Sequence, residues 1–451
     1  MDNIIKKIII VGAGIGGLAI AKKLALKNKY DVTLFEKGPY GALAYDWSDD
    51  VEKSIFDRGL VNMPSSKFIE KKPWTFVMPF EGIHIYVPQP AEHVDYSIDR
   101  RLFSQQLADE AEVSGAKILF KSNVEKVILD DNNKVIGVVV DDTNHYADLV
   151  IDSAGLFSSV KNSLPQEFNM SNDITSEEIF YAYRAYYERN EVEPSKFTNK
   201  VYIKHLGGCG ISWCIDRGDV VDVLIGLMGV DNEKHRLAAL EAIKKDNPCL
   251  GDKLLNGGKT YQIPIKYPAL KMVTSGYAAI GNSAYMTIPL LGSGIAASIK
   301  AAAILADVID KTPSSDFNEE VLWEYQVRVF KLFGADYIAI DYLKRWLLGL
   351  DIKYIRKIVK SGLLSESELA IVARGDRICL SVKEKLKKLT KAVKSPSSLL
   401  KLNYLLMKMD RGYKIGMSIP TAYDINAIAK WQKNLNCFIK SLANPAKVEK
   451  Q

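Results

Sequence analysis

Residues 7–36 read KIIIVGAGIGGLAIAKKLALKNKYDVTLFE, and this stretch decides the fold. The short β-branched run at 7–11 predicts a buried strand. A helical pattern follows from Gly16 to about residue 26, and a second apolar run at 32–35 predicts another strand. Strand, helix and strand in this order predict a βαβ unit with two parallel strands.

The turn between the first strand and the helix carries glycines at the spacing of a dinucleotide-binding site. Gly12 allows the tight turn, Gly14 lets the backbone approach a pyrophosphate, and Gly16 lets the helix pack closely on the strand. The helix N-terminus offers free N–H groups to phosphate oxygens. Glu36 ends the second strand, where its carboxylate can accept hydrogen bonds from ribose hydroxyls. The predicted nucleotide-binding residues are Gly12, Gly14, Gly16, Gly17, Glu36 and Lys37.

Three later segments indicate which dinucleotide binds. Residues 98–107 read IDRRLFSQQL, residues 151–159 read IDSAGLFSS, and residues 281–294 read GNSAYMTIPLLGSG. They resemble the "R-x-x-F-x-x-x-L", "D-A-x-G-x-x-S" and "G-D-A-A" segments of flavoprotein hydroxylases and geranylgeranyl reductases. The resemblance implies FAD as the cofactor. It assigns to FAD binding Arg100, Val124 (the first residue of a predicted strand at 124–129), Gly155, Gly281, Asn282, Pro289, Gly292 and Gly294.

The last segment also has a physical interpretation that is independent of the resemblance. Glycines at 292 and 294 let the backbone pack against a flat ring, and the helix predicted over 292–309 directs its positive end at that ring. This explains the uncharged run at 276–299 better than a membrane span does. Asn282 replaces the aspartate of those families, so a hydrogen-bonding group is kept without its charge.

A fourth segment indicates the substrate. Residues 210–218 read GISWCIDRG and are similar to the "Y-x-W-x-F-P-K-G" strand and turn of geranylgeranyl reductases, which lines their substrate cavity. Trp213, Arg217 and Gly218 are kept, whereas Ile211 and the Ile-Asp pair at 215–216 depart from the pattern. The same stretch is more distantly similar to the "W-x-W-x-I-P" motif of flavin halogenases. In order and spacing, residues 1–310 resemble the geranylgeranyl reductase family of the para-hydroxybenzoate hydroxylase structural group.

Three residues are candidates for catalysis. Trp213 is one, on the strength of the resemblance. The loop after Glu36 should pass near the flavin edge, so Asp46 could donate a proton while Tyr45, together with Trp47, walls the substrate. The alternative is a loop with two anchoring aromatic side chains and a solvated acid, and both interpretations stay open.

The fold class expected is α/β, with a Rossmann-type FAD-binding domain, an antiparallel substrate sheet and a C-terminal helical region. The aromatic run at 179–187 and the apolar run at 220–228 predict long strands of that second sheet. A helix is predicted at 98–111 with Leu102, Phe103, Leu107 and Ala111 on its buried side. The expected boundaries are 1–70, 97–170 and 260–312 for FAD binding, 71–96 and 171–259 for the substrate sheet, and 313–451 for the helices.

Charge and cysteine content limit the partners. Residues 344–451 hold 23 Lys and Arg against 8 Asp and Glu, a net charge of +15, whereas the whole chain carries +6. No nucleic-acid motif is present, so this part is expected either to face an anionic membrane surface or to be a solvated helical surface. Five scattered cysteines without metal-ligand spacing indicate reduced thiols and a cytoplasmic protein with no metal site. Cys209 and Cys214 could form a redox pair, but inert buried thiols are the expected state.

These features predict an FAD-dependent oxidoreductase that reduces isolated C=C bonds of a polyprenyl lipid, with hydride from the flavin and a proton from an acid. Its electrons would come from an external donor, either reduced ferredoxin or NAD(P)H. A flavin monooxygenase using NAD(P)H and O2 is the first alternative. A non-catalytic prenyl-binding protein of the same fold is the second, although glycines at 292 and 294 have no purpose without a ring.

Overall fold

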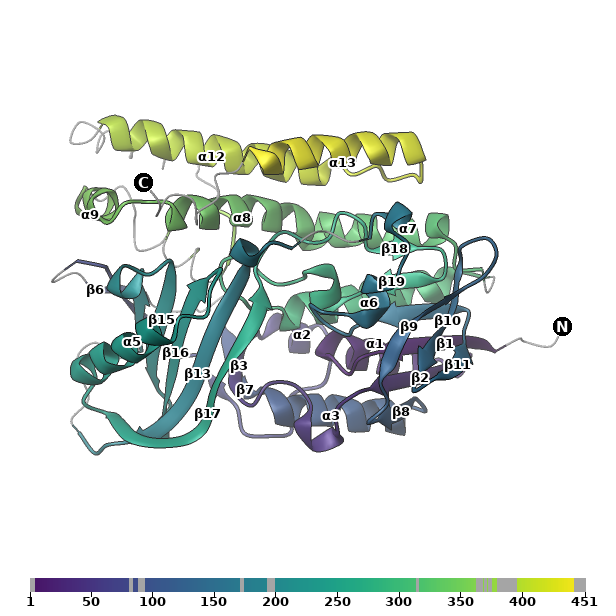
Figure 1. Ribbon diagram of the computed structural model, residues 1–451, viewed down its shortest axis with the longest axis horizontal. Coiled ribbons are helices and arrows are strands. Elements are labelled where there is room, and N and C mark those ends of the chain that lie inside the picture. The colour runs from purple at the N-terminus through teal and green to yellow at the C-terminus, as the bar shows by residue number, and fades with distance from the viewer. Residues whose placement is uncertain are drawn as a thin grey trace.

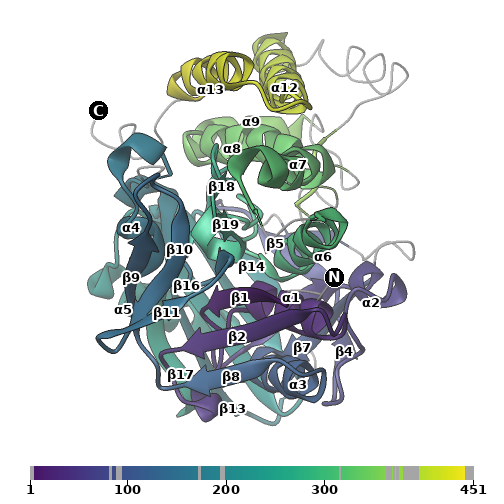
Figure 2. The same cartoon turned by 90° about the vertical axis from the view of Figure 1, so that its right-hand side faces the viewer.

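The computed structural model describes residues 5–80, 84–87, 94–170, 174–192, 199–313, 316–361, 368, 371, 375–378 and 396–441. Two large β-sheets stand side by side, and helices from the C-terminal third form a layer along one side of both (Figures 1 and 2). The predicted α/β class, with a Rossmann-type unit, a second sheet and a helical C-terminal region, is confirmed.

The first sheet is the nucleotide-binding type. Its strands are, in spatial order, β18 (Val273–Thr274), β19 (Tyr277–Ala279), β12 (Leu149–Asp152), β1 (Lys6–Val11), β2 (Tyr30–Glu36) and β8 (Lys117–Phe120). From β19 to β8 every neighbouring pair is parallel. Residues 8–11 of β1 are buried, which explains why this part of the strand is a continuous β-branched run.

Helices and a small sheet cover the two faces of this first sheet (Figure 2). On one face, α1 (Ile15–Ala25) packs between α3 (Arg100–Val113) and α6 (Ile295–Lys311). The other face carries the antiparallel strands β9 (Val124–Leu129), β10 (Val135–Val140) and β11 (Thr143–Tyr146). One continuous apolar core joins these layers.

The second sheet is mostly antiparallel. Its order is β17 (Leu250–Pro264), β13 (Ile179–Arg189), β16 (Val220–Met228), β15 (Gly210–Asp216), β14 (Lys200–Ile203), β5 (Trp74–Val77) and β6 (His84–Val87). Side chains alternate between its two faces. Val221, Val223 and Ile225 pack under the amphipathic helix α5 (Glu233–Asp246), and the residues between them point towards the first sheet.

Shorter elements connect the two sheets. β3 (Ser48–Glu52) and β4 (Ile69–Glu70) both pair with β7 (Asp95–Asp99), and β7 leads directly into α3. α2 (Ser54–Asp57) follows β3, and α4 (Ser159–Asn162) follows β12. β3 therefore belongs to this small sheet, and it lies against the inner face of the second sheet, where Asp49 reaches Arg184.

The C-terminal helices form two layers (Figure 1). α7 (Glu319–Val329) and α8 (Ala335–Leu348) run on through a π-helical turn at Phe330–Gly334. α9 (Ile352–Lys360) follows α8 in the same layer, and α12 (Pro396–Met417) and α13 (Ile425–Lys440) form the outer layer (Figure 1). Gly416 lets α12 approach α8, because a Cβ there would lie 2.8 Å from the Cα of Ala335. None of the helices in these described ranges has both the length and the apolar content needed to cross a membrane.

Two local expectations were wrong. Leu102 is 48% exposed, because the helix begins at Arg100 and its buried stripe runs through Phe103, Leu107 and Ala111. The helix predicted from residue 292 begins at Ile295, after a tight turn. Two tyrosines of β13 pack in the core: the Tyr183 and Tyr187 hydroxyls hydrogen-bond to each other at 3.2 Å, on the face covered by α5.

Candidate functional site

One cavity of about 760 Å³ runs from the carboxyl end of the parallel sheet to the inner face of the second sheet. A crevice at the carboxyl ends of parallel strands is where such sheets bind nucleotides. The lining residues predicted from the sequence are Gly12, Gly14, Gly16, Glu36, Lys37, Tyr45, Arg100, Gly155, Trp213, Gly281, Asn282, Gly292 and Gly294.

The glycine loop is shaped by contacts that exclude side chains. Gly12 has φ +87°, and a Cβ there would lie 2.7 Å from both the Ala154 Cα and the Ser153 carbonyl oxygen. At Gly14 a Cβ would lie 2.9 Å from the Ser153 Oγ. Gly14 also precedes α1 and supplies no side-chain cap, so the first N–H groups of the helix are open to the cavity. An anionic phosphate fits there.

Glu36 is held in place by the loop that it faces. Its Oε2 accepts a hydrogen bond from the Ala13 N–H at 2.8 Å, and its Oε1 accepts one from the Gly38 N–H at 2.7 Å. A carboxylate has further lone pairs, so it can also accept from the hydroxyls of a ribose. The position of Glu36 therefore matches the ribose contact that the sequence predicts.

A buried aspartate joins the two segments that follow β12 and β19. The Oδ1 of Asp152 accepts from the Ala154 N–H and from the Ser283 hydroxyl, both at 2.9 Å. Its Oδ2 accepts from the hydroxyls of Ser158 at 2.6 Å and Tyr277 at 2.8 Å. Asp152 is fully buried, so these four bonds fix the Gly155 turn against the Gly281–Ala284 turn. Sequence reasoning quoted this aspartate within a motif but assigned it no role.

The turn at 287–294 forms the next part of the wall. The Thr287 hydroxyl donates to the Asn282 Oδ1 at 2.9 Å, which leaves the amide nitrogen of Asn282 as a donor. Gly292 has φ +74° and its nearest neighbours lie 3.8 Å or more from a Cβ, so open space faces it. Gly294 caps α6 without a side chain and presents another free helix N-terminus. Pro289 lies in this turn but is not among the residues that line the cavity.

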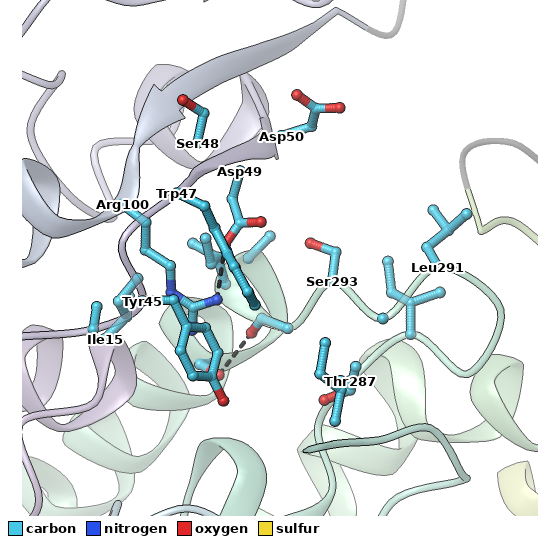
Figure 3. A pocket seen from close by; sticks show the side chains of 18 of the residues that line it. Ile15, Tyr45, Trp47, Ser48, Asp49, Asp50, Arg100, Thr287, Leu291 and Ser293 are labelled. Atoms are coloured by element: carbon cyan, nitrogen blue, oxygen red, sulfur yellow. Dashed lines mark hydrogen bonds and ion pairs between the residues drawn. The ribbon is translucent and has the colours of Figure 1, made fainter. Parts of the chain in front are cut away.

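Arg100 faces this turn from the other side of the cavity (Figure 3). Its Nη1 donates to the Asp49 Oδ2 at 2.8 Å, and its guanidinium lies 4.6 Å from the centre of the Tyr45 ring. The Nε of Arg100 is buried and has no hydrogen-bond partner in the described part of the chain. A buried donor of this kind is costly unless an acceptor reaches it, so Arg100 fits a bound acceptor group.

The loop after Glu36 builds an aromatic wall. The rings of Tyr45, Trp47 and Tyr261 contact one another, with centroid separations of 4.5, 4.7 and 4.8 Å. Tyr45 and Trp47 line the cavity, as expected of wall residues. Tyr261 comes from β17, more than 200 residues away, and sequence reasoning missed it because no local pattern links the two segments.

Besides Pro289, three of the predicted site residues lie outside this cavity. Asp46 is 39% exposed, does not line the cavity and pairs with Arg101 at 3.2 Å. Val124 is buried at the start of β9, where its carbonyl accepts from the Ser159 hydroxyl. Gly17 lies inside α1, where its N–H donates to the Ser153 Oγ at 3.0 Å. The carboxylates that do line the cavity beside the aromatic wall are those of Asp49 and Asp50.

A network of buried charges forms the floor of the cavity. Arg184 on β13 donates to both oxygens of Asp222 on β16, from Nε at 3.0 Å and from Nη2 at 2.7 Å. Arg217 donates to the Asp222 Oδ2 from Nη2 at 2.8 Å. Burial alone would raise the pKa of Asp222, but the two guanidinium groups outweigh it and hold that pKa at about 2. Asp222 is therefore ionised throughout the physiological range.

The acids of this region also accept hydrogen bonds from the indole N–H groups of Trp213 and Trp47, which line the cavity. Trp213 donates from Nε1 to the Asp222 Oδ1 at 3.3 Å, and Trp47 donates from Nε1 to the Asp49 Oδ2 at 3.0 Å. Arg184 connects the two acids, because its Nη1 lies 3.4 Å from the Asp49 Oδ1. The charged side chains thus form hydrogen bonds with one another and with the indole N–H groups, and the indole rings face the cavity. The apolar side chains around them are Phe180, Ile211, Ile215, Leu224, Ile263, Ile288 and Leu291.

The thiol contact in the structure is not the one considered from the sequence. Cys209 and Cys214 are both buried reduced thiols, and the Cys214 thiol hydrogen-bonds to Cys249. That bond lowers the pKa of the half-buried Cys249 to about 7. Cys214 and Cys249 lie on the α5 side of the second sheet, away from the cavity, whereas Cys209 packs with Phe180 and Leu224 on the other side.

Comparison with known proteins agrees with this architecture. A family model described as an NAD(P)-binding Rossmann-like domain matches residues 10–70. A digeranylgeranylglycerophospholipid reductase of Sulfolobus acidocaldarius is 21% identical over 450 residues, 95% of this chain and 96% of the relative. The chain is similar to this reductase over nearly its whole length, and a digeranylgeranylglycerophospholipid reductase of Methanococcoides burtonii is 24% identical over 71% of the chain and 78% of the relative.

Solved structures with the same fold include a reductase-like protein and a halogenase. A geranylgeranyl bacteriochlorophyll reductase-like protein from Thermoplasma acidophilum superposes with a TM-score of 0.72 at 22% identity, covering 89% of this chain and 99% of that one. The myxobacterial chondrochloren halogenase, an FAD-dependent halogenase, gives a TM-score of 0.60 at 13% identity, covering 96% and 97%. The resemblance to geranylgeranyl reductases predicted from the sequence is confirmed.

Proposed function

We propose that this protein is an FAD-dependent reductase that saturates isolated C=C bonds of a polyprenyl lipid. One observation carries the proposal: a single cavity joins a dinucleotide cradle to a wall of aromatic and aliphatic side chains. A polar substrate would need free hydrogen-bond donors and acceptors on that wall. The charged side chains of the cavity floor, Arg184, Arg217 and Asp222, instead pair with one another. The reductases similar to this chain over its whole length favour the same chemistry.

The residues present fit FAD. The glycine loop and Glu36 would hold the ADP half, and Lys37 lies beside them. The unpartnered Nε of Arg100 and the open space at Gly155 and Gly292 leave a donor and room for the flavin half. FAD, when bound, supplies hydride transfer, which no side chain can provide.

The chain's own contribution would be alignment and exclusion of water. We infer that the Trp213 and Tyr45 rings contact the substrate chain, since both line the cavity and both are fixed by charged partners. If binding holds the reacting double bond in one orientation, the entropy of orienting it is lost on binding and no longer adds to the activation barrier. Asp222 would act as a positioning residue, because it touches Trp213 and Arg184 and does not itself line the cavity.

The remaining expectations also belong to the proposal. Electrons would come from reduced ferredoxin or NAD(P)H. A membrane-resident substrate would bring the protein to the cytoplasmic face of a membrane through its basic C-terminal region.

An anaerobic half-reaction tests the proposal. The flavin is reduced with dithionite, candidate polyprenyl lipids are added, and flavin absorbance is followed. We expect reoxidation, together with product that gains the mass of two hydrogen atoms per bond. Reoxidation by no isoprenoid, with rapid oxygen-dependent turnover of an aromatic acid, would indicate a monooxygenase. A colourless protein that cannot be reconstituted with FAD would indicate a non-catalytic carrier.

A further inference from the structure

Helix α12 carries large apolar side chains on the side that faces away from the protein. Leu400, Tyr404 and Met407 are 70%, 51% and 60% exposed, and the Tyr404 hydroxyl also hydrogen-bonds to Tyr342 of α8. Their spacing of four and three residues places them in one stripe along the helix. On the opposite side, Leu405 and Met409 are each 1% exposed and pack in the core. The helix therefore has two apolar sides, and only one of them is covered by the fold.

Basic side chains border the exposed stripe. Lys401 and Lys408 lie beside it, and the Lys408 Nζ is 5.3 Å from the centre of the Tyr404 ring. Arg411 extends the stripe towards the C-terminal end of the helix and is exposed. Asp410 is the one acid in α12, and it pairs with Lys414 at 2.7 Å. The exposed side of α12 is thus apolar and positively charged.

Helix α9 enlarges this surface. The Lys401 Nζ lies 4.5 Å from the centre of the Tyr354 ring, which brings the two helices together. The inner side of α9 packs Ile352, Ile355 and Val359 into the cluster that contains Trp213. Its exposed residues include Lys353, Arg356 and Lys360, and the helix contains no acid. The basic surface therefore lies over the part of the second sheet that carries the cavity wall (Figure 1).

We propose that the outer faces of α12 and α9 dock on an anionic lipid bilayer. Apolar side chains flanked by Lys and Arg suit the boundary between headgroups and acyl chains, where burial and attraction to anionic lipids add together. The net charge of +15 over residues 344–451 favours a negatively charged partner. The purpose of docking rests on the proposed function, since a bilayer at α9 would bring a lipid substrate next to the wall at Trp213. Binding itself does not depend on turnover.

Co-sedimentation with vesicles tests the docking face. The full chain is mixed with vesicles of phosphatidylcholine alone or of an equal mixture of phosphatidylcholine and phosphatidylglycerol. We expect sedimentation only with the mixture, and loss of binding near 1 M salt, where the screening length falls to about 3 Å. Protein that stays in the supernatant with both vesicle types would overturn the proposal.

Matched variants assign the binding to this surface. The double change Leu400→Ser and Met407→Ser should lower vesicle affinity by about tenfold or more, because two exposed apolar side chains no longer insert. Leu237→Ser on α5, also an exposed leucine, should leave it unchanged. Lys401→Glu with Lys408→Glu should weaken binding, whereas Lys234→Glu with Lys245→Glu on α5 should not. Equal losses in both sets, or none in either, would contradict the assignment.

Circular dichroism and thermal unfolding of each variant would show that the fold is intact. The proposed reductase activity can fail independently of this result, because vesicle binding needs neither a reduced flavin nor an alkene. Conversely, a reductase that turns over detergent-dispersed lipid but ignores anionic vesicles would keep the proposed function and remove the docking face.

Discussion

Asp222 and Arg184 form a bidentate ion pair in the wall of the cavity, with separations of 3.0 Å between Oδ1 and Nε and 2.7 Å between Oδ2 and Nη2. Asp222 is completely buried and the side chain of Arg184 is 4% exposed. Their strands are neighbours in the second sheet, whereas the Asp49 that Arg184 also approaches belongs to β3. The contact of Arg184 with Asp49 therefore ties the second sheet to β3.

Removing the negative charge of this pair should strongly destabilise the protein. Asp222→Asn leaves the guanidinium of Arg184 buried without its main counter-charge, which costs about 3–5 kcal/mol of unfolding free energy. The double variant Asp222→Asn with Arg184→Gln removes both charges and should recover part of that loss. Urea unfolding followed by circular dichroism would measure Asp222→Asn, Arg184→Gln and the double variant. If the double variant were as unstable as the sum of the two single changes, the two residues would not be coupled.

The same pair should make stability depend on acid pH. The pKa of Asp222 is about 2 in the folded protein, below the ordinary value of 3.8, because the guanidinium groups outweigh the effect of burial. A carboxylate with a lowered pKa stabilises the fold above its unfolded pKa, and that stabilisation is lost as pH falls towards the folded pKa. Between about pH 4 and pH 2 the protein should lose about 2 kcal/mol through this group. Urea unfolding across that range should show a shallower decline for Asp222→Asn.

The thiol of Cys249 should titrate near neutral pH. Its hydrogen bond from Cys214 lowers its pKa to about 7, so its thiolate fraction rises through that pH. Alkylation by iodoacetamide, followed by peptide mass spectrometry, should be half-maximal in rate near pH 7. Cys214→Ala removes the donor and should move the midpoint upwards. An unchanged midpoint in that variant would show that the neighbouring thiol is not the cause.

The features predicted from the sequence are those that neighbouring residues determine. The glycine turn, the strand before it and the acid at the end of the second strand lie within thirty residues, so periodicity and spacing were enough. Arg184 and Asp222 are 38 residues apart and meet only because β13 and β16 pair in one register. Tyr261 on β17 contacts Tyr45 in the loop before β3, although 216 residues separate them in the sequence. Such contacts depend on sheet register, which no local pattern contains.

Asp46 lies as one of the two interpretations of its loop expects, as a partly solvated acid between two aromatic side chains. The sequence predicts that residues 45–47 pass near the flavin edge, and the structure brings Tyr45 and Trp47 to the cavity. The side chain between them points to the outside and pairs with Arg101, whereas Asp49 reaches Arg100 from the following strand. Which acid faces inward was set by where β3 begins, and this boundary was not predicted.

Turnover should therefore be insensitive to Asp46 and sensitive to Trp213. Asp46→Asn should keep kcat and KM within about twofold, because its carboxylate is partly exposed and lies outside the cavity. Trp213→Leu should lower kcat/KM about tenfold, because it removes a ring from the wall and the hydrogen bond that the indole donates to Asp222. Steady-state kinetics with a polyprenyl lipid would measure both variants. A large loss of kcat in Asp46→Asn would instead indicate that Asp46 is the proton donor.

Glycine substitutions test whether the nucleotide-binding loop needs glycine because a side chain would clash there, or only because glycine is flexible. Gly12→Ala should abolish flavin binding, because its Cβ would lie 2.7 Å from the backbone of Ala154 and its φ of +87° is strained for alanine. Gly41→Ala is a matched control, since nothing lies within 4 Å of a Cβ there. The ratio of flavin to protein absorbance, and quenching of flavin fluorescence on titration, would measure binding. We expect a loss of at least about 100-fold for Gly12→Ala, roughly 3 kcal/mol, and no change for the control. If Gly12→Ala bound FAD normally while remaining folded, the cradle would lie elsewhere in the cavity, and the assignment of Glu36 to the ribose would have to be abandoned with it.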